Sequence, residues 1–404
     1  MNSRNSVGTI APAHFVSPAD NSPHLTSWDD VCRVITQDDE GKWDQLVPRD
    51  ELRLEDGHLS FPKRYAAQGN SVPTSLRLTN WATQQLCQRL GIPAAYYRRC
   101  PLPLQDAQGN YFLRHPEKTE KAESAKDSRW LLRAKGSTLR GLLSDRYSRI
   151  GNTDVLQALT PALTEVGYGV RWFALTDESL HLRLVDPRRI REVLPGDAVI
   201  SGLHLTNSEV GKRSITVDTM VWRLVCQNGL VRLVKGKSLF SQRHMGLSLP
   251  ELTATLPEVI RRALLEGEAV VDRMTQATSH RVADLEGVIA TIASDWSLSQ
   301  TMEERIIASL QSESWGQQET LYGLVNAVTQ VAQGLAPDDR YSLEALAGTL
   351  LESGPPAVRA EPRSRKSDSV DSVDAVESTN LISLEPSPGE KSGEPRLTLF
   401  GSDW

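Results

Sequence analysis

The spacing of apolar residues changes once along this chain of 404 residues, and that change limits the folds open to it. Between residues 129 and 248, stretches such as SLHLRLVD (179–186) and SITVDTMVWRLVC (214–226) alternate apolar and polar residues, which is typical of half-buried antiparallel strands. From residue 249 to residue 353 the apolar residues recur every three or four positions, as in amphipathic helices. We therefore predict an α+β protein, in which a twisted antiparallel sheet with packed helices is followed by a helical subdomain and a disordered C-terminal tail.

The segments outside this pattern complete the predicted organisation. Asp56-Gly57 separates two alternating runs and predicts a hairpin turn, while Gly91 and Gly167 are suited to end helices. Residues 354–396 lack periodicity and are rich in Ser, Asp, Glu and Pro, as disordered segments are. The predicted parts are a disordered N-terminus (1–25), a helix and hairpin region (26–113), a charged loop (114–128), a central β-rich domain (129–248), a helical subdomain (249–353) and a disordered acidic tail with a terminal apolar motif (354–404).

Composition argues against a membrane protein and against a metal centre. Hydrophobic residues make up 39% of the chain, and no stretch approaches the roughly 20 apolar residues that a membrane-spanning helix needs. The N-terminus has no apolar core like that of a signal peptide, so we expect a cytoplasmic protein with no membrane partner. The four cysteines form no Cys-x-x-Cys pair, and no His-x-His or His-Glu-x-x-His spacing occurs. We therefore expect reduced thiols, no metal and no cofactor.

Two strongly basic segments stand out in a chain whose net charge is −6. Residues 128–150 hold six Arg or Lys against one acid, and residues 205–246 hold seven against two. Residues two apart on a strand share a face, so Arg133 projects beside Lys135, and Lys235 beside Lys237. The segments predict a cationic groove for nucleic-acid phosphates, with aromatic rings nearby that can stack on bases. The alternative is a solvated basic face balanced by acids of the helical region. The rings are Tyr147, Trp172 and Trp222.

Three short motifs sharpen this prediction. SDRYSR (144–149) offers guanidinium groups that match phosphate oxygens, or else an ion pair of Asp145 that pins a turn. TNSEVGKRS (206–214) is suited to an anion-binding loop, or to a turn built by Asn207 and Ser208. SQRHMG (241–246) adds an arginine and a histidine. The residues predicted to contact nucleic acid are Arg133, Lys135, Arg140, Arg146, Tyr147, Arg149, Asn207, Lys212, Arg213, Trp222, Arg223, Lys235, Lys237, Arg243 and His244.

The last residues, PRLTLFGSDW, regain apolar character after the acidic tail. Apolar residues behind a disordered tether are typical of a short linear motif that docks on a partner. The predicted anchors on a host protein are Leu397, Leu399, Phe400 and Trp404. The alternative is that LTLF adds a strand to the chain's own sheet.

Several motifs, taken in order, resemble a known family. They are LRGLLSDRYSRIGNTDVLQAL (139–159), LHLTNSEVGKRSITVDTMVWRLVCQNGLV (203–231), RHMG (243–246), NAVTQVAQ (326–333) and LEALAGTLLE (343–352). Together they resemble the phage/plasmid-like family catalogued as domain of unknown function 932, over roughly residues 75–353. The resemblance implies a gene of phages, plasmids or other mobile elements, which are rich in proteins of DNA recombination, replication and anti-defence.

These observations favour a non-enzymatic nucleic-acid-binding protein, of phage or plasmid origin, with a role in DNA recombination or replication. Single-stranded DNA, duplex DNA and RNA all fit the charge pattern. A second hypothesis is an enzyme that acts on a nucleotide or nucleic acid, using His244 with Asp218 or Glu209. A third is a module that binds a host protein. The helical region is also compatible with self-assembly into a homo-oligomer.

Overall fold

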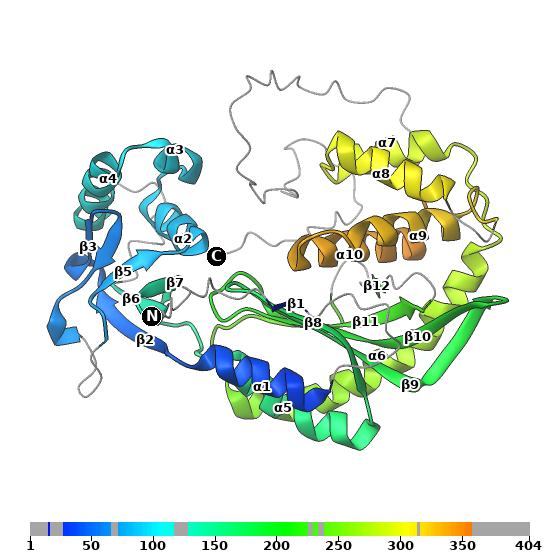
Figure 1. Ribbon diagram of the computed structural model, residues 1–404, viewed down its shortest axis with the longest axis horizontal. Coiled ribbons are helices and arrows are strands. Elements are labelled where there is room, and N and C mark those ends of the chain that lie inside the picture. Colours follow the sequence, from blue (N-terminus) through cyan, green and yellow to red (C-terminus); the bar gives the residue numbers. More distant parts are fainter. Residues whose placement is uncertain are drawn as a thin grey trace, which may run out of the picture.

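The computed structural model describes residues 15–16, 27–65, 72–116, 128–224, 229–232, 238–312 and 316–357. Within them the chain builds two β-sheets, and helices cover both faces of the larger sheet (Figure 1). The structure is α+β, as the sequence predicts. The segments predicted to be disordered, 1–25 and 354–404, fall almost wholly outside the described residues.

The smaller sheet has six strands in the order β2-β6-β7-β5-β4-β3. Its neighbouring strands are antiparallel except β5 and β7, which pair in parallel. The predicted turn at Asp56-Gly57 is confirmed, since both residues have positive φ (49° and 73°) and join β3 to β4. The strands are β2 (Lys42–Pro48), β3 (Arg53–Glu55), β4 (His58–Ser60), β5 (Ser75–Leu78), β6 (Arg129–Lys135) and β7 (Thr138–Ser144).

Three helices pack on the smaller sheet around a core that includes Leu86, Leu113 and Trp130. The first of them ends at Gly91, which adopts the left-handed conformation expected of a glycine C-cap. The helices are α2 (Asn80–Leu90), α3 (Ala94–Arg99) and α4 (Leu102–Arg114), and two 3₁₀ turns, η1 (Arg49–Glu51) and η2 (Lys63–Tyr65), flank the strands.

The pairing of β6 and β7 differs from the single central sheet predicted for residues 129–248. These two strands pair with β2 and β5, from the first hundred residues, and not with the strands after residue 168. Alternating apolar residues show that a strand has a buried face, but they do not identify its neighbour. The boundary predicted at residue 129 therefore falls inside the smaller sheet.

The larger sheet has seven strands, in the order β1-β8-β9-β10-β11-β12 with β13 also pairing with β11. All its pairs are antiparallel, as predicted. The strands are β1 (Phe15–Val16), β8 (Gly169–Leu175), β9 (Leu180–Leu194), β10 (Asp197–Asn207), β11 (Ile215–Arg223), β12 (Gly229–Arg232) and β13 (Phe240–Gln242).

One face of the larger sheet is apolar and is covered by α1 (Trp28–Asp39), α5 (Asn152–Val166) and α6 (Leu249–Ala277), which lie below it in Figure 1. The helix α6 begins at a capping box, because Ser248 accepts from the backbone of Glu251 and the Glu251 carboxylate accepts from Ser248. Strand residues on this face include Leu182, Leu203 and Val217.

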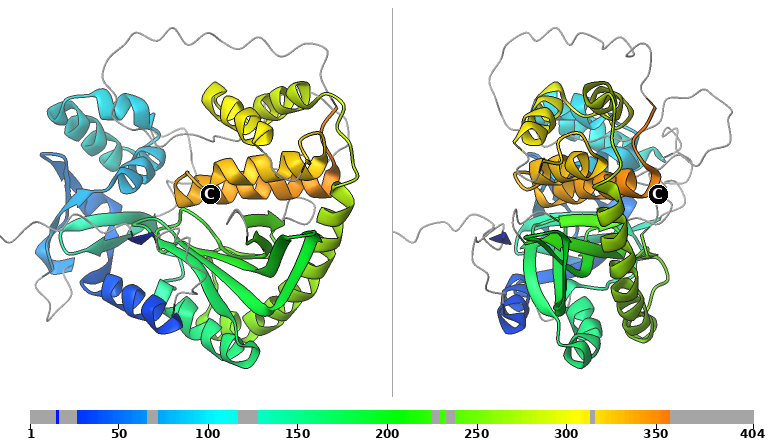
Figure 2. Two further views of the ribbon diagram at one scale, coloured as in Figure 1. Left: turned by 45° about the vertical axis from the view of Figure 1, so that its right-hand side comes forward. Right: turned by 90° about the vertical axis from the view of Figure 1, so that its right-hand side faces the viewer.

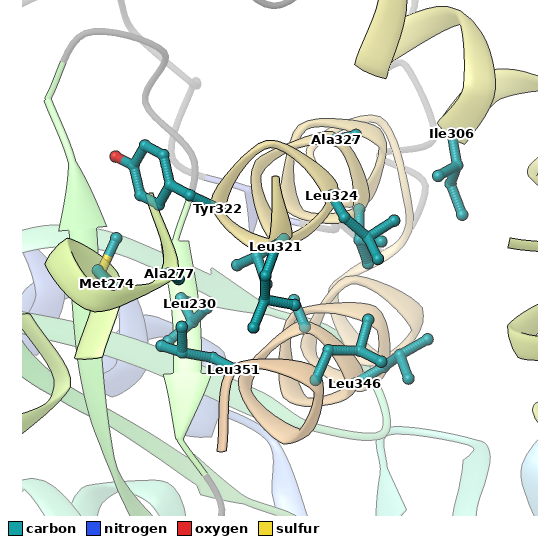
Figure 3. Packing of buried hydrophobic residues seen from close by; sticks show 14 of the residues in the cluster. Leu230, Met274, Ala277, Ile306, Leu321, Tyr322, Leu324, Ala327, Leu346 and Leu351 are labelled. Atoms are coloured by element: carbon teal, nitrogen blue, oxygen red, sulfur yellow. The ribbon is translucent and has the colours of Figure 1, made fainter. Parts of the chain in front are cut away.

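The opposite face is covered by α9 (Leu321–Ala332) and α10 (Pro337–Ser353), and α7 (Leu285–Asp295) and α8 (Gln300–Gln311) lie farther out (Figure 2). Figure 3 shows Leu321 and Leu324 of α9 against Leu346 and Leu351 of α10. A Cβ at Gly348 would lie 2.0 Å from the carbonyl oxygen of Val231. Only glycine therefore lets α10 approach β12 this closely.

The helices that follow β13 begin at Leu249 and end at Ser353. They are not a separate body, because α6 covers one face of the larger sheet and α9 and α10 cover the other. No helix in the described ranges is both long enough and apolar enough to cross a membrane.

Candidate functional site

The loop of residues 208–214, between β10 and β11, lies where the two sheets meet. The carbonyl oxygen of Val210 accepts hydrogen bonds from Trp81 Nε1 and Gln85 Nε2 of α2, each 2.9 Å long. Gly141 of β7 lies directly against the Val210 side chain, and Gly211 adopts a φ of 76°. Residues 208–211 are buried. This part of the loop therefore joins the sheets and does not face solvent.

Glu209 is the centre of this junction. Its carboxylate accepts from Lys42 (2.7 Å), Arg140 (2.8 Å) and the backbone N–H of Asn152 (2.9 Å). Its carbonyl oxygen accepts from Arg133 at 2.6 Å. Burial alone would raise the pKa of Glu209, but Arg140 and Lys42 outweigh it and hold the pKa well below its ordinary value. The carboxylate is therefore ionised and binds together segments that are far apart in sequence.

His244 and Tyr147 form a buried stack beside Glu209. Their rings are parallel within 1°, with centroids 5.0 Å apart. His244 Nε2 lies 2.9 Å from Asn207 Oδ1, and Asn207 Nδ2 donates to Asn152. The Tyr147 hydroxyl donates to the carbonyl oxygen of Ser208. Burial lowers the pKa of His244 to about 4, so its imidazole is neutral at pH 7 and donates from Nε2 to Asn207.

Three of the predicted arginines are exposed on the two segments that carry this stack. A β-bridge between Tyr147 and Met245, with a 2.7 Å hydrogen bond from Ser148 N to His244 O, holds two short segments antiparallel. Continued by two residues, this register places Arg149 opposite Arg243. Arg146 is the neighbour of Tyr147 in the same turn. We call Arg146, Arg149 and Arg243, all exposed, the arginine ridge.

The other predicted residues that the structure describes have partners within the fold or are buried in it. Lys135 pairs with Asp38, and Lys212 pairs with Glu178 while its ammonium lies 4.3 Å from the centre of the Trp81 ring. The remaining members fall into three groups: Arg133, Arg140, Tyr147, Asn207, Trp222, Arg223 and His244 are buried; Arg213 pairs with Asp338; and Lys235, Lys237, Leu397, Leu399, Phe400 and Trp404 lie outside the described residues.

Burial changes the role of the side chains that were expected to meet phosphates and bases. Arg223 forms a two-point ion pair with Asp197 (2.6 and 2.8 Å). Trp172 and Trp222 lie against the guanidinium of Arg183, at 4.6 and 5.3 Å from the ring centres. Residues with these partners bring strands and helices together. Of the predicted nucleic-acid contacts that the structure describes, the three members of the arginine ridge are the ones whose side chains are exposed.

A second polar cluster, which the sequence analysis did not single out as a site, lies between the larger sheet and α10. We call it the polar layer. His204 Nε2 lies 3.2 Å from His181 Nδ1, and His181 Nε2 lies 2.9 Å from Asp338 Oδ1. Arg213 also pairs with Asp338. The strand residues of the layer are His181, Arg183, His204 and Asp218, and the helix residues are Asp338, Arg340, Tyr341 and Glu344.

The proton positions in this layer follow from the partners. Desolvation lowers the pKa of His181 and of His204, so both rings are neutral. His181 then donates from Nε2 to the Asp338 carboxylate and accepts at Nδ1 from His204 Nε2. His204 Nδ1 is left as a buried acceptor for which the described residues supply no hydrogen-bond partner.

Asp218 occupies the other side of the layer. It accepts a 2.8 Å hydrogen bond from the Tyr341 hydroxyl. Burial raises the pKa of Asp218 to about 7, although the bond from Tyr341 acts in the opposite direction. Arg183 and Arg340 each donate a hydrogen bond of 3.0 Å to the Glu344 carboxylate. The layer therefore fastens α10 to three strands through charged and polar groups.

The hydrogen bonds of Asp218 and Glu209 bear on the enzyme hypothesis, because both carboxylates were considered as partners of His244 and both bond to other residues. Asp218 bonds to Tyr341, and Glu209 bonds to Lys42 and Arg140. His244 itself bonds to Asn207. Across the described ranges, no group of three or more His, Cys, Asp and Glu side chains is arranged to hold a metal ion.

Comparison with protein families matches residues 140–371, more than half of the chain, to the family described as a domain of unknown function (DUF932). The chain belongs to the DUF932 family. The match covers the larger sheet from β8 onward, the loop of residues 208–214, the arginine ridge and the polar layer. It begins within β7, so it leaves out most of the smaller sheet. No curated protein and no solved structure matches the chain.

Proposed function

We propose that this DUF932 protein binds nucleic acid through the arginine ridge and performs no reaction on it. The observation that carries the proposal is the grouping of Arg146, Arg149 and Arg243 on two segments paired by a β-bridge. Guanidinium groups match phosphate oxygens with paired hydrogen bonds. The ridge therefore suits a ligand that carries phosphates.

The support beneath the ridge favours binding as its role. Tyr147 and His244, the neighbours of Arg146 and Arg243, are buried, stacked on one another and bonded to Ser208 and Asn207. Such contacts fix the backbone from which the arginines project, so less conformational entropy is lost when a ligand binds. His244 is neutral and bonded to an amide, which suits a structural role better than proton transfer.

The overall negative charge is compatible with this proposal, because local charge determines where an anion binds. We further propose a mobile-element origin with a role in DNA recombination or replication, which rests on the family resemblance alone.

A binding titration tests the proposal. The full chain is titrated against labelled single-stranded DNA, duplex DNA and RNA at two salt concentrations, and fluorescence anisotropy is measured. The ridge variant should bind more weakly, and the slope of log K against log salt should become shallower by roughly 0.7–0.9 for each phosphate that the variant no longer neutralises. The ridge variant is Arg146→Ala, Arg149→Ala and Arg243→Ala.

A second triple variant removes the same charge elsewhere: Arg261→Ala, Arg262→Ala and Arg281→Ala, three exposed arginines. This control should keep the affinity and salt slope of the native protein. Equal weakening in both variants would show that only net charge matters and would contradict the proposal. So would a native protein that binds none of the three nucleic acids.

A further inference from the structure

The large apolar side chains that the described residues expose are concentrated on α3 and α4. Seven are exposed in the described ranges, and four of them fall between residues 96 and 111. These four are Tyr96 (51% exposed), Leu102 (50%), Leu104 (42%) and Tyr111 (48%). The other three lie apart on β9, after β13 and on α6. Exposed apolar groups that gather in one place mark interaction surfaces more often than scattered ones do.

Hydrogen bonds through Cys100 join the two helices that carry these side chains. The Cys100 thiol donates to the carbonyl oxygen of Tyr96, and Gln108 Nε2 donates to the Cys100 sulfur. Leu104, Gln108 and Tyr111 are spaced by four and three residues, so they share one side of α4. We call Tyr96, Leu104, Gln108 and Tyr111 the α3–α4 face. In Figure 1 these helices lie at the outer end of the smaller sheet, away from the larger one.

The two helices that carry this face are positively charged. Arg98, Arg99 and Arg114, which we call the arginine rim, are exposed on these helices, and Arg98 also donates to the carbonyl oxygen of Asn80 at 3.2 Å. The acid within this stretch, Asp106, is turned toward the backbone N–H of Gly57, 3.2 Å away. The face therefore suits an apolar partner that carries negative charge.

The chain itself supplies a segment of this chemistry. Leu397, Phe400 and Trp404 follow one another at i, i+3 and i+7, the spacing of anchors that enter a hydrophobic groove from one side of a helix. Upstream of them, residues 368–394 contain seven acids and a single lysine. We propose that residues 397–404 dock on the α3–α4 face of the same chain, with the acidic stretch beside the arginine rim.

The length of chain between Ala357 and Leu397 allows this contact. A flexible tether of this length spans on the order of 35 Å on average. A folded body of about 350 residues has a radius of gyration of roughly 20 Å, so the segment can reach any side of the molecule. A second copy is the poorer occupant, because a twofold contact through this face would bring the two arginine rims together.

Hydrogen–deuterium exchange of the full chain tests the docking. A tethered segment has an effective concentration on the order of millimolar. If its intrinsic Kd is on the order of 100 µM, amides of α3 and α4 that exchange only when the face is free should exchange about tenfold faster once docking is abolished. The tail variant is Leu397→Ser, Phe400→Ser and Trp404→Ser. Its matched control, which changes three other apolar residues of the tail, is Leu381→Ser, Ile382→Ser and Leu384→Ser.

A second pair of variants changes the face in place of the tail. Leu104→Ser with Tyr111→Ser should speed exchange in residues 397–404, whereas Leu265→Ser, a more exposed leucine on α6, should not. The substituted side chains are exposed, so the native melting temperature should hold. The proposal is overturned if the tail variant, like its control, leaves the exchange rates of α3 and α4 unchanged. It is also overturned if protection rises with protein concentration, which would indicate a second copy, or if the tail protects the edge of the larger sheet instead.

Discussion

The two faces of the larger sheet are both hidden from water, but only the face toward α10 buries a layer of charged and polar side chains among its apolar ones. Toward α5 and α6, neighbouring strands present Leu182, Leu203 and Val217. Toward α10, the same strands present His181, His204 and Asp218, which are also fully buried. On the first face, removing apolar surface area from water is enough to make burial favourable. On the second face it is tolerated only because nearly every polar group has a partner. The comparison shows that alternation along a strand identifies which residues share a face, but not which face meets solvent.

The difference has a consequence for specificity. Apolar contacts are non-directional, so the α5–α6 side accepts small shifts of a helix. A buried ion pair requires one geometry, and removing one partner is costly even where the pair itself adds little stability. We therefore expect the polar layer to fix the register of α10, and we expect substitutions on the two faces to differ in size and in pH dependence.

The largest effect should come from the polar face. Glu344→Gln leaves the guanidinium groups of Arg183 and Arg340 buried without their counter-charge. The free energy of unfolding should fall by about 3–5 kcal/mol in a urea titration. The control Glu319→Gln breaks an exposed pair with Arg281 and should cost less than about 0.5 kcal/mol. A loss below about 1 kcal/mol for Glu344→Gln would mean that the pair is hydrated in solution.

On the apolar face, Leu205→Ala should reduce the free energy of unfolding by about 2–5 kcal/mol, because it leaves a cavity among Leu205's buried neighbours. The loss should be the same at pH 5 and pH 8, since no titratable group is changed. Leu205→Met, which keeps the volume, should cost less than about 1.5 kcal/mol. A pH-dependent loss for Leu205→Ala would show that the two faces are coupled through the sheet.

Asp218 should make the polar face sensitive to rising pH. Its pKa is about 7 in the folded protein, against an ordinary value of 3.8. The folded state therefore holds the proton more tightly than the unfolded state, and stability is lost as pH rises from about 4 to 7. Between pH 5 and pH 8 the native protein should lose roughly 3 kcal/mol relative to Asp218→Asn. Parallel pH–stability curves for the two proteins would contradict this assignment.

His244, at the junction of the sheets, should act in the opposite direction. Its pKa is about 4 when folded and 6.5 ordinarily, so the unfolded state binds the proton more tightly. Stability is then lost as pH falls below 6.5. From pH 8 to pH 5 the native protein should lose about 2 kcal/mol relative to His244→Gln, which keeps a donor toward Asn207. Thermal unfolding followed by circular dichroism measures the difference. The histidine would be solvated if the variant were equally sensitive to acid.

Much of the architecture can be predicted from local patterns. The alternation of residues 214–223 predicts β11, and the change of period at residue 249 predicts the start of α6. Pairing could not be predicted, because it depends on residues far apart: Arg133 pairs with Asp44 across β2 and β6.

The candidate site was only partly predictable for the same reason. Arg146 and Arg243 lie in basic segments and could be identified from charge. The burial of Arg140 depends on Glu209, a distant residue that the charge balance of the first basic segment did not include. The sequence contains one indication of the polar layer, since His181 and His204 lie in two successive predicted strands. Nothing in the spacing of these histidines shows that α10 covers them.

The start of the family match, at residue 140, bears on how this protein can be divided. Residue 140 lies inside β7, whose neighbours β6 and β5 are both earlier in the chain. A fragment cut there would leave β7 without either neighbour and remove Lys42 and Arg133 from around Glu209. Residues 140–371 alone therefore lack strands and side chains that hold the junction together in the full chain.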